Sequence, residues 1–416
     1  GRFDDQHMYA FLKQNFRWIA GGFLLTYFSS FGQTFFVSAS IAEWQAAFDL
    51  SHGEFGRLYM FATLASAVCL PFLGRLVDVV PEHRSILLVI PVLASATLLA
   101  AYAPSVTVLA IAIFLLRLFG QGMMTHIALT ATGRWFALQR GRAVSLVVLG
   151  HQGGEATLLL AFTGLAAGYG YQAGWVAGAA ALMLVGLPFA YWAFSKPRTT
   201  RHDLDEHAEM PEQRHWTRAE VLRDPIFWIL LTGVLAPPFI GTIIFYHQDY
   251  LTALNDWPPR YYAMSLSVMA LTTVTFALLG GAIIDRFRAA TVLPVFLLPL
   301  AATCFVFASG GSTTSLLVAM VLLGMSYGFS STLFGAVWPE VYGTANLGSI
   351  RSIIVSAMVF ATAAGPGLTG TLIDRGIPLP EQMTWFGVYC LLAALAVGFA
   401  SQRLRLRHLR ARAGVV

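Results

Sequence analysis

Three ionisable residues lie inside the most apolar segments of this chain, where charged side chains are costly. Arg117 lies in LLRLFGQG, and His151 and Glu155 lie in LGHQGGEATLL. A spacing of four residues puts His151 and Glu155 on one face of a helix. Histidine titrates near neutrality, and a carboxyl group at this depth titrates outside its ordinary range, so the pair could accept and release a proton. The three residues are therefore candidates for proton coupling, and Arg117 is also a candidate partner for an anionic substrate.

Each of these residues also has a structural interpretation. Arg117 could donate hydrogen bonds to backbone carbonyls of a neighbouring helix, or Glu155 could form a buried ion pair with it while His151 is only a bystander. We favour the functional interpretation because ionisable residues inside a membrane usually mark ion or substrate pathways. Gln121, one turn after Arg117, and Gln152 join Arg117 as candidate substrate-binding residues.

Composition determines the class of protein that must position these residues. The chain is 57% hydrophobic and 11% charged, with a mean hydropathy of +0.66, whereas a soluble domain is roughly 25% charged. We therefore predict an all-α integral membrane protein. Its three cysteines, Cys69, Cys304 and Cys390, lie in apolar segments without metal-ligand spacing.

Several function classes are excluded on the same grounds. The chain has no Walker pattern, no phosphate-binding Gly-rich loop with Lys and no CxxC motif. We predict neither an enzyme nor an ATP-driven pump, and no cofactor or metal. The net charge of +5 is not a nucleic-acid signal, because the Arg residues lie in segments beside the apolar runs. The expected partners are the bilayer, protons and a small-molecule substrate, bound by a monomer.

The apolar runs can be drawn as twelve spans of about 20 residues each. Charged residues then divide the chain into an N-terminal segment (1–17), a six-helix bundle (18–194), a linker (195–224), a second six-helix bundle (225–400) and a basic tail (401–416). The predicted spans are 18–42, 55–74, 85–103, 106–130, 143–167, 174–194, 225–251, 261–284, 291–308, 315–337, 348–373 and 383–400.

The distribution of basic residues predicts the orientation. Of the 26 Lys and Arg residues, only Arg57, Arg260 and Arg375 fall in segments assigned to the outer side, and Arg117 lies within a span. By the positive-inside rule, both termini are cytoplasmic, and we expect the protein in the inner or plasma membrane.

Other polar residues within the spans are candidates for a cavity or gate. Pro237 and Pro238 should break the seventh span, and Tyr246 and His247 follow near its outer end. The remaining candidates for substrate binding are Tyr27 and Gln33 in the first span and Tyr327 in the tenth. Each could equally be a helix-contact residue.

Two short loops carry the same pattern in the two halves of the chain. Gly74–Arg84 reads GRLVDVVPEHR, and Gly281–Arg288 reads GAIIDRFR. Asp78 and Asp285 lie 207 positions apart, as do Gly141 and Gly348, which indicates an internal duplication. A small Gly allows backbones to approach closely, and Asp can cap a helix or pair with Arg. The predicted gating residues are Gly74, Asp78, Arg84, Gly281, Asp285 and Arg286.

This pair of loops resembles the loop signature of the major facilitator superfamily. The resemblance implies two pseudo-symmetric six-helix bundles and transport by alternating access. Arg117, Gly120 and Gly122 are similar to the superfamily's fourth-span pattern, in which the Arg takes part in proton coupling or anion binding.

A narrower resemblance is to bacterial relatives of the monocarboxylate and oxalate/formate transporters. In WFALQRGRAVSLVVLG, the residues that match in order and spacing are Trp135, Phe136, Arg140, Ala143 and Gly150. The family's carboxylate-binding Arg in the eighth span has no counterpart, because residues 261–284 contain no Arg and no internal acid. A Lys in the first span is missing as well.

The resemblance implies a secondary transporter of a small, carboxylate-like organic anion, with protons as the coupling ion. Arg117 would then replace the missing Arg, and the loops around Asp78 and Asp285 would close the inner side. One alternative is a proton-driven exporter of amphiphilic drugs or metabolites, although the fifth-span segment GHQGGE lacks that group's Gly–Pro signature. Another is a transporter-like sensor. Uptake and export remain alternatives, as do symport, antiport and uniport.

Overall fold

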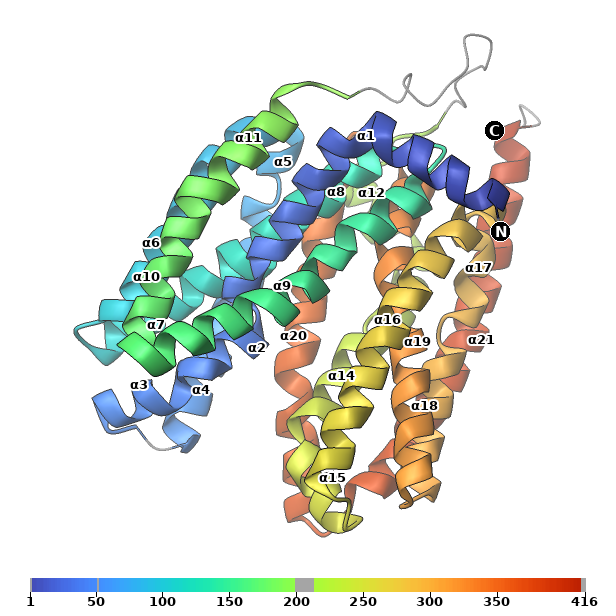
Figure 1. The fold of residues 1–416 in the computed structure, drawn as a ribbon. Coiled ribbons are helices and arrows are strands. Elements are labelled where there is room, and N and C mark those ends of the chain that lie inside the picture. Colours follow the sequence, from blue (N-terminus) through green and yellow to red (C-terminus); the bar gives the residue numbers. More distant parts are fainter. Residues whose placement is uncertain (1, 51, 199–212, 413–416) are drawn as a thin grey trace. The chain divides into compact units, whose positions relative to one another are not determined.

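The computed structural model describes residues 2–50, 52–198 and 213–412, and every regular element within them is helical (Figure 1). The predicted all-α class is therefore confirmed. The chain forms two compact units. Unit 1 comprises Gly1–Leu138, Leu146–Gln213 and Thr344–Ser356, and unit 2 comprises Gln139–Ser145, Arg214–Gly343 and Ala357–Val416.

Unit 1 contains most of the helices from the first half of the sequence. These are α1 (Arg2–Phe28), α2 (Thr34–Val37), α3 (Ile41–Phe48), α4 (His52–Leu73), α5 (Leu76–Val79), α6 (Glu82–Tyr102), α7 (Val106–Leu115), α8 (Thr125–Trp135), α9 (Arg140–Tyr169), α10 (Tyr171–Ala181) and α11 (Leu187–Ser195). Wider π-helical turns, η3 (Leu116–Met124) and η4 (Leu182–Gly186), join α7 to α8 and α10 to α11.

Unit 2 contains most of the helices from the second half. These are α12 (Arg218–Arg223), α13 (Pro225–Val234), α14 (Ala236–Tyr246), α15 (Gln248–Leu254), α16 (Pro259–Phe287), α17 (Ala289–Val292), α18 (Leu298–Ser309), α19 (Thr313–Tyr342), α20 (Leu347–Asp374) and α21 (Leu379–Arg412). Two helices are divided between the units: α9 begins in unit 2 and continues in unit 1, and α20 does the reverse.

Ten helical segments of the described chain are long and apolar enough to cross a membrane. They correspond to every predicted span except the first and the fifth. The fifth corresponds to α9, which has 30 residues. The chain is thus a multi-pass membrane protein, and the number twelve stays a prediction.

Polar side chains fix where several helices start. The hydroxyl groups of Ser105, Thr217 and Ser312 each accept a hydrogen bond from the amide three residues later. Asp224 accepts one from the amide of Ile226 and so begins α13. These side chains satisfy amides that the first helical turn leaves without a partner.

The first predicted span is not one helix, so that expectation is wrong. α1 runs without interruption from Arg2 to Phe28, across the predicted boundary at residue 17. It then gives way to a 3₁₀ turn, Ser29–Gly32, and Gln33 is extended. The hydroxyls of Ser29 and Ser30 bond to carbonyls three residues earlier, a competition with the backbone that bends or ends helices.

The seventh predicted span is interrupted where its proline pair predicts. α13 ends at Val234 and α14 begins at Ala236. Pro237 and Pro238 lack the amide hydrogen needed to continue the preceding helical ladder.

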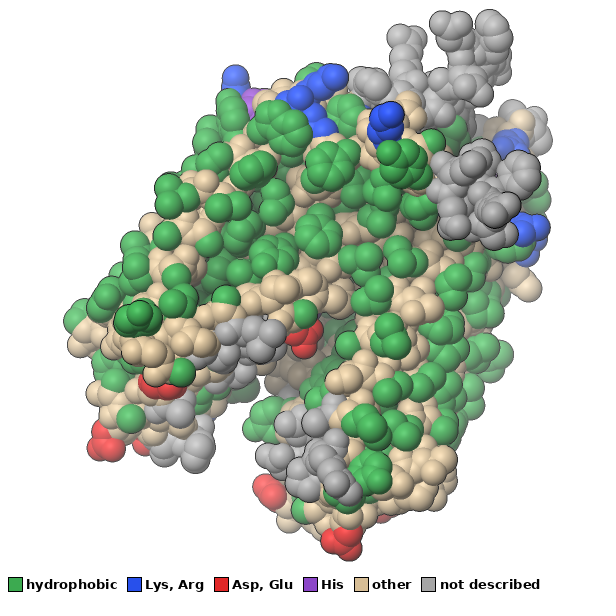
Figure 2. Space-filling view, viewed as in Figure 1, with side chains coloured by type: hydrophobic (Ala, Val, Ile, Leu, Met, Phe, Trp, Pro, Cys, Tyr) green, Lys and Arg blue, Asp and Glu red, His purple; other side chains and the backbone are tan. Residues whose placement is uncertain are grey.

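Exposed acidic and basic side chains gather at opposite ends of each unit (Figure 2). Glu43 and Asp49 are exposed at one end of unit 1, and Asp256 and Glu381 are exposed at one end of unit 2. The basic ends carry Arg17 and Lys196 in unit 1 and the tail of α21 in unit 2. This distribution agrees with the charge asymmetry in the sequence.

Asp224 joins three parts of unit 2. Its carboxylate accepts two hydrogen bonds from Arg407, at 2.7 and 2.8 Å, and one from the Tyr342 hydroxyl at 3.1 Å. Burial alone would raise the pKa of Asp224, but these bonds, the charge of Arg407 and the Ile226 amide hold its pKa below the ordinary value of 3.8. The ionised form is therefore the one that stabilises the fold.

Replacing Asp224 with alanine should destabilise unit 2 by about 2 kcal/mol, because it leaves Arg407 and the Tyr342 hydroxyl without their acceptor. Since the folded pKa is depressed, this contribution is present above pH 3.8 and is lost as pH falls through the lower folded pKa. Melting temperatures of wild type and Asp224→Ala should thus differ at pH 7 and converge in strong acid. Glu220→Gln, which removes the exposed ion pair with Arg214, is the matched control and should change little. Equal melting temperatures at pH 7 would contradict this role of Asp224.

Candidate functional site

The break after α1 brings two backbones of unit 1 together. A Cβ built on Gly32 would lie 2.0 Å from the Leu116 carbonyl oxygen and 2.8 Å from the Gly120 Cα atom, and one built on Gly120 would lie 2.7 Å from Gly32. Only glycine permits this approach. Because α1 has ended, the Gly32 carbonyl is free to bond outside its own helix.

Arg117 uses that carbonyl. It is 3% exposed, and its Nη1 donates to the Gly32 oxygen at 2.8 Å and to the Thr34 hydroxyl at 3.3 Å. The guanidinium carbon lies 5.3 Å from the centroid of the Tyr59 ring. This geometry matches the structural interpretation of Arg117, in which it bonds to a neighbouring backbone.

The guanidinium group nevertheless keeps unused hydrogen-bonding capacity. Within the described residues, the buried Arg117 Nε has no hydrogen-bond acceptor. The Thr34 hydroxyl that Nη1 contacts lies 2.8 Å from the Tyr59 hydroxyl. An unsatisfied buried donor of this kind costs about 1–3 kcal/mol, and it is chemically suited to an anion. No sequence pattern identifies Thr34 and Tyr59, because nothing in it shows that the break in the first span brings Thr34 to Arg117 or that α4 brings Tyr59 there.

His151 and Glu155 lie on α9, one helical turn apart, as predicted. Glu155 is exposed. Among the described residues it has no hydrogen-bond partner, and the Glu155–Arg117 ion pair considered from the sequence is not formed. His151 is half-buried.

The glycines around these residues hold α9 against α1. A Cβ on Gly150 would lie 2.2 Å from the Phe23 carbonyl oxygen, and one on Gly154 would lie 2.6 Å from that of Tyr27. The Thr26 hydroxyl also donates to the Val147 carbonyl at 2.6 Å. Small residues spaced by four therefore set the distance between the helices, as in other membrane helix pairs.

The other polar residues predicted in unit 1 are Tyr27 on α1, Gln33 just after the break, Gln121 in η3 and Gln152 on α9. The Tyr27 hydroxyl is 2.6 Å from that of Thr157, and Gln33 Nε2 donates to Ser29 Oγ at 3.4 Å. In the described part of the chain, the buried amide oxygens of Gln121 and Gln152 have no donor. These two amides are further unsatisfied groups that a polar ligand or water could bind.

The residues predicted in unit 2 do not gather at one point. Tyr246 is 69% exposed, whereas His247 is 8% exposed and bonds through Nε2 to the Thr369 hydroxyl at 2.8 Å. Tyr327 packs against Gly241, and its hydroxyl donates to the Pro237 carbonyl at 3.5 Å. His247 therefore lies at the end of the broken seventh span, and Tyr327 contacts that span from α19.

The first predicted gating loop caps a helix from the far end of the sequence. In unit 1, Asp78 accepts hydrogen bonds from the amides of Gly348 and Ser349, both at 2.8 Å, and from the Ser349 hydroxyl at 2.7 Å. These groups begin α20, where the helix dipole also favours a negative charge. Gly74 lies against Ser352 and the buried His126, whose Nε2 is 3.1 Å from the Gly74 carbonyl oxygen.

The second loop makes the equivalent contact inside unit 2. Asp285 accepts hydrogen bonds from the amides of Gly141 at 2.7 Å and Arg142 at 3.0 Å, which begin α9. A Cβ on Gly141 would lie 2.4 Å from the Gly281 carbonyl oxygen, so the close approach requires glycine here. Asp78 and Asp285 thus bind amide pairs that are themselves 207 positions apart.

The arginine that pairs with Asp78 comes from elsewhere in unit 1, and Arg84 and Arg286 stay candidate gating residues. In the described chain, Arg84 pairs with no carboxylate, and Arg286 is exposed with its guanidinium carbon 5.3 Å from the Phe287 ring centroid. The cation beside Asp78 is Arg134, at 2.9 Å, and it also lies 3.5 Å from Glu82. Arg134 lies more than 50 residues from Asp78 in the sequence, so spacing could not identify it.

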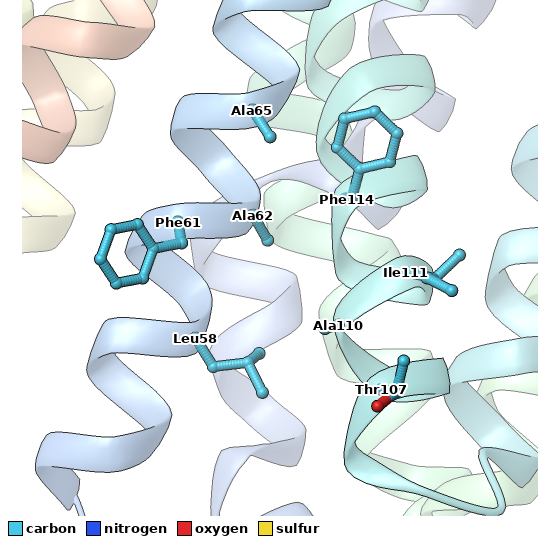
Figure 3. Close-up of a pocket in the computed structure, with 8 residues that line it drawn as sticks. All are labelled: Leu58, Phe61, Ala62, Ala65, Thr107, Ala110, Ile111 and Phe114. Carbon is cyan, nitrogen blue, oxygen red and sulfur yellow. The ribbon is translucent and has the colours of Figure 1, made fainter.

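An apolar groove of about 310 Å³ lies between α4 and α7 (Figure 3). Phe61 points away from α7, and Leu58, Ala62 and Ala65 line the α4 side. The α7 side is formed by Thr107, Ala110, Ile111 and Phe114. None of the predicted polar residues lines it, so this groove is distinct from the surroundings of Arg117.

Comparison with known proteins gives a family match and several similar structures. The sequence profile described as Major Facilitator Superfamily matches residues 23–366. The human organic anion transporter MFSD10 (TETRAN) is 15% identical with a TM-score of 0.65, over 92% of this chain and 99% of that chain. The proton:xylose symporter XylE bound to 6-bromo-6-deoxy-D-glucose is 14% identical with a TM-score of 0.67, over 92% and 94%.

A third similar structure is the superfamily transporter FucP in the outward conformation, at 14% identity and a TM-score of 0.66, over 92% of this chain and 98% of that chain. At these identities the likeness is one of fold. No curated protein sequence matches the chain.

Proposed function

The chain belongs to the major facilitator superfamily, and from that premise we propose that it carries a small organic anion across the membrane by proton-coupled alternating access. The family makes it a membrane transporter and not an enzyme. The observation that carries the substrate proposal is the buried Arg117, whose Nε–H has no acceptor among the described residues while its Nη1 contacts the Thr34 hydroxyl. The similar fold of an organic anion transporter supports it.

Arg117 would bind a carboxylate, with Thr34 and Tyr59 positioning its guanidinium. A cation kept at this depth is stabilised by an anionic partner, because lipid cannot solvate it. A planar guanidinium can offer two parallel N–H groups to a carboxylate. Gln121 and Gln152 would supply further contacts, and Tyr27, Gln33, Tyr246, His247 and Tyr327 are the remaining candidates.

Glu155 would carry the proton, with His151 as its neighbour. An ionised carboxylate exposed to hydrocarbon is strongly disfavoured, so Glu155 must either meet water or be protonated. With no substrate, the positive Arg117 and negative Glu155 balance each other. With substrate bound to Arg117 and a proton on Glu155, the charge is balanced again, so both forms could reorient.

Asp78 and Asp285 would stabilise one conformational state of the transport cycle, the state in which the inner side is closed, by capping α20 and α9. Their release from these amides would accompany the opening of the inner side, as the two units change orientation. We further propose an inner-membrane monomer with both termini cytoplasmic, based on the clustering of basic residues, and a six-plus-six division of the spans at the linker.

Export of amphiphilic compounds is the second candidate. The apolar groove between α4 and α7 favours it, because an amphiphile could enter there from the lipid. A thermal-shift screen of small carboxylates and lipophilic cations at two pH values distinguishes the candidates, since a ligand of the folded state raises the melting temperature.

For a carboxylate found in that screen, Arg117→Gln should weaken binding by about 10-fold to 100-fold, because a hydrogen bond to a charged group contributes about 1.5–3 kcal/mol. Arg117→Lys should recover part of this loss, since lysine keeps the charge but not the two parallel donors. Titration calorimetry measures the dissociation constants. Arg57→Gln, which removes an exposed arginine elsewhere in unit 1, is the control. Unchanged affinity in Arg117→Gln would remove Arg117 from the site.

A further inference from the structure

The last helix extends well beyond what is needed to cross the hydrocarbon. α21 has 34 residues, which corresponds to about 51 Å at 1.5 Å per residue. The hydrocarbon core is about 30 Å thick, and the bilayer with its headgroups is about 40–45 Å thick. A helix tilt of roughly 30–35°, within the range seen for membrane helices, would keep the entire helix within the bilayer and its headgroup layers.

One face of α21 is apolar along almost its whole length. Its exposed residues follow each other at steps of four and three, which keeps them on one side of a helix. They are Val388, Leu392, Leu395, Phe399, Leu406 and Leu409, with Gln402 completing the series. Leu395 is 74% exposed in the span, and Leu409 is 60% exposed in the tail. The surface that meets lipid therefore continues without a change of direction past residue 400.

Arginines flank this stripe in the tail. Arg403, Arg405, Arg410 and Arg412 are exposed, and within the described residues none of them forms an ion pair with a carboxylate. The guanidinium carbon of Arg403 lies 5.1 Å from the centroid of the Phe399 ring. α21 has no acidic residue after Glu381. The free face of the tail thus combines four uncompensated positive charges with two exposed leucines.

The opposite face of the tail is already occupied by protein. Arg407 is bonded to Asp224 and lies 5.4 Å from the Trp216 ring centroid. Leu404 is buried, and the Ser401 hydroxyl donates to the Ala290 carbonyl at 2.5 Å. These contacts fix the rotation of the helix, so the arginine–leucine face must point away from unit 2.

We propose that this face binds anionic phospholipid headgroups of the leaflet at the basic end of unit 2. Leu406 and Leu409 would insert at the boundary between headgroups and acyl chains, and the four arginines would bind lipid phosphates. Two features support lipid over other partners: the stripe is continuous with the lipid-facing side of the span, and the positive charge complements an anionic leaflet. Each basic residue near such a surface contributes about 1 kcal/mol, or about fivefold in binding.

The rival occupant is another segment of protein. The acidic stretch of the linker has the charge that would complement the arginines. In the sequence this stretch contains Asp203, Asp205, Glu206, Glu209 and Glu212, which lie outside the described residues. A probe on the stripe separates the two, because lipid and protein give it different neighbours.

The full-length protein, with Cys69→Ala to remove background labelling, is labelled with an environment-sensitive thiol probe at Leu406→Cys. Ala411→Cys, which is exposed on the opposite side of the same turns, is the matched control. Vesicles contain phosphatidylcholine with increasing phosphatidylglycerol and a nitroxide-headgroup lipid. We expect a blue shift and strong quenching at position 406 that grow with phosphatidylglycerol, and little change at position 411.

Arg403→Gln combined with Arg410→Gln should weaken the preference for phosphatidylglycerol by about 25-fold. The double variant Arg57→Gln/Arg375→Gln loses the same charge at other exposed sites and should keep the preference. Equal quenching at positions 406 and 411, or a response unaffected by phosphatidylglycerol and by the arginine substitutions, would overturn the proposal. A probe at 406 that is shielded from both water and the quencher would also overturn it, in favour of a protein occupant.

Discussion

Replacing Glu155 with glutamine should abolish substrate accumulation driven by a pH gradient while leaving exchange of labelled for unlabelled substrate intact. Glutamine has the shape of the protonated glutamic acid but cannot release a proton. The loaded carrier would then still reorient, whereas the proton could no longer be delivered or removed. In proteoliposomes, the ratio of internal to external substrate should fall to one.

The control for this experiment is Glu43→Gln, which removes an exposed acid on α3 of the same unit. It should accumulate substrate as the wild type does. The ligand is the carboxylate found by the thermal-shift screen, so binding is established before transport is measured. If Glu155→Gln still accumulates substrate to the wild-type ratio, another group carries the proton.

Replacing Asp78 with alanine should expose the start of α20 to solvent exchange. The carboxylate receives three hydrogen bonds from Gly348 and Ser349 and faces Arg134. Losing them should cost about 3 kcal/mol or more. Amide hydrogen exchange of Gly348 and Ser349 should then accelerate on the order of 100-fold or more, since opening at a helix start becomes local and frequent.

Asp285→Ala should produce the same acceleration at Gly141 and Arg142 and none at Gly348 and Ser349. The two variants therefore control for each other, because a general loss of stability would accelerate exchange at both sites. Peptide-level hydrogen exchange with mass spectrometry measures this. Protection at Gly348 that survives the removal of Asp78 would show that the contact does not hold α20. We also expect slower transport in both variants, since the capped state would be depleted.

Much of the fold follows from composition and spacing. Low charge and long apolar runs indicate a helical membrane protein, and Pro237 and Pro238 predict the division of the seventh span. The break at Ser29–Gly32 was missed because the segment remains apolar enough to read as one span, although its serines compete for backbone hydrogen bonds. That break determines the surroundings of Arg117.

The candidate site could be predicted only in part. Hydrophobic context picks out Arg117 and Glu155, because charged residues are conspicuous in apolar segments. The partners of Arg117 are the Gly32 carbonyl, the Thr34 hydroxyl and the Tyr59 ring, all more than 50 positions away, and no local pattern specifies them. For the loops, the sequence contains a usable signal. Asp78 and Asp285 are separated by the same 207 positions as Gly141 and Gly348. Arg84 and Arg286 belong to the repeated loop pattern and lie near the two aspartates in sequence, whereas Asp78 bonds to amides 270 positions away.

The reciprocal capping of α20 by Asp78 and of α9 by Asp285 has a consequence for the ancestry of the chain. Each half of the sequence supplies the acid that the other half needs, so neither half can complete its own helix start. A half-length ancestor could have satisfied both sets of amides only by associating with a second copy of itself. If the two halves arose by duplication, the present protein preserves, in one polypeptide, an exchange of contacts that would have held two separate subunits together.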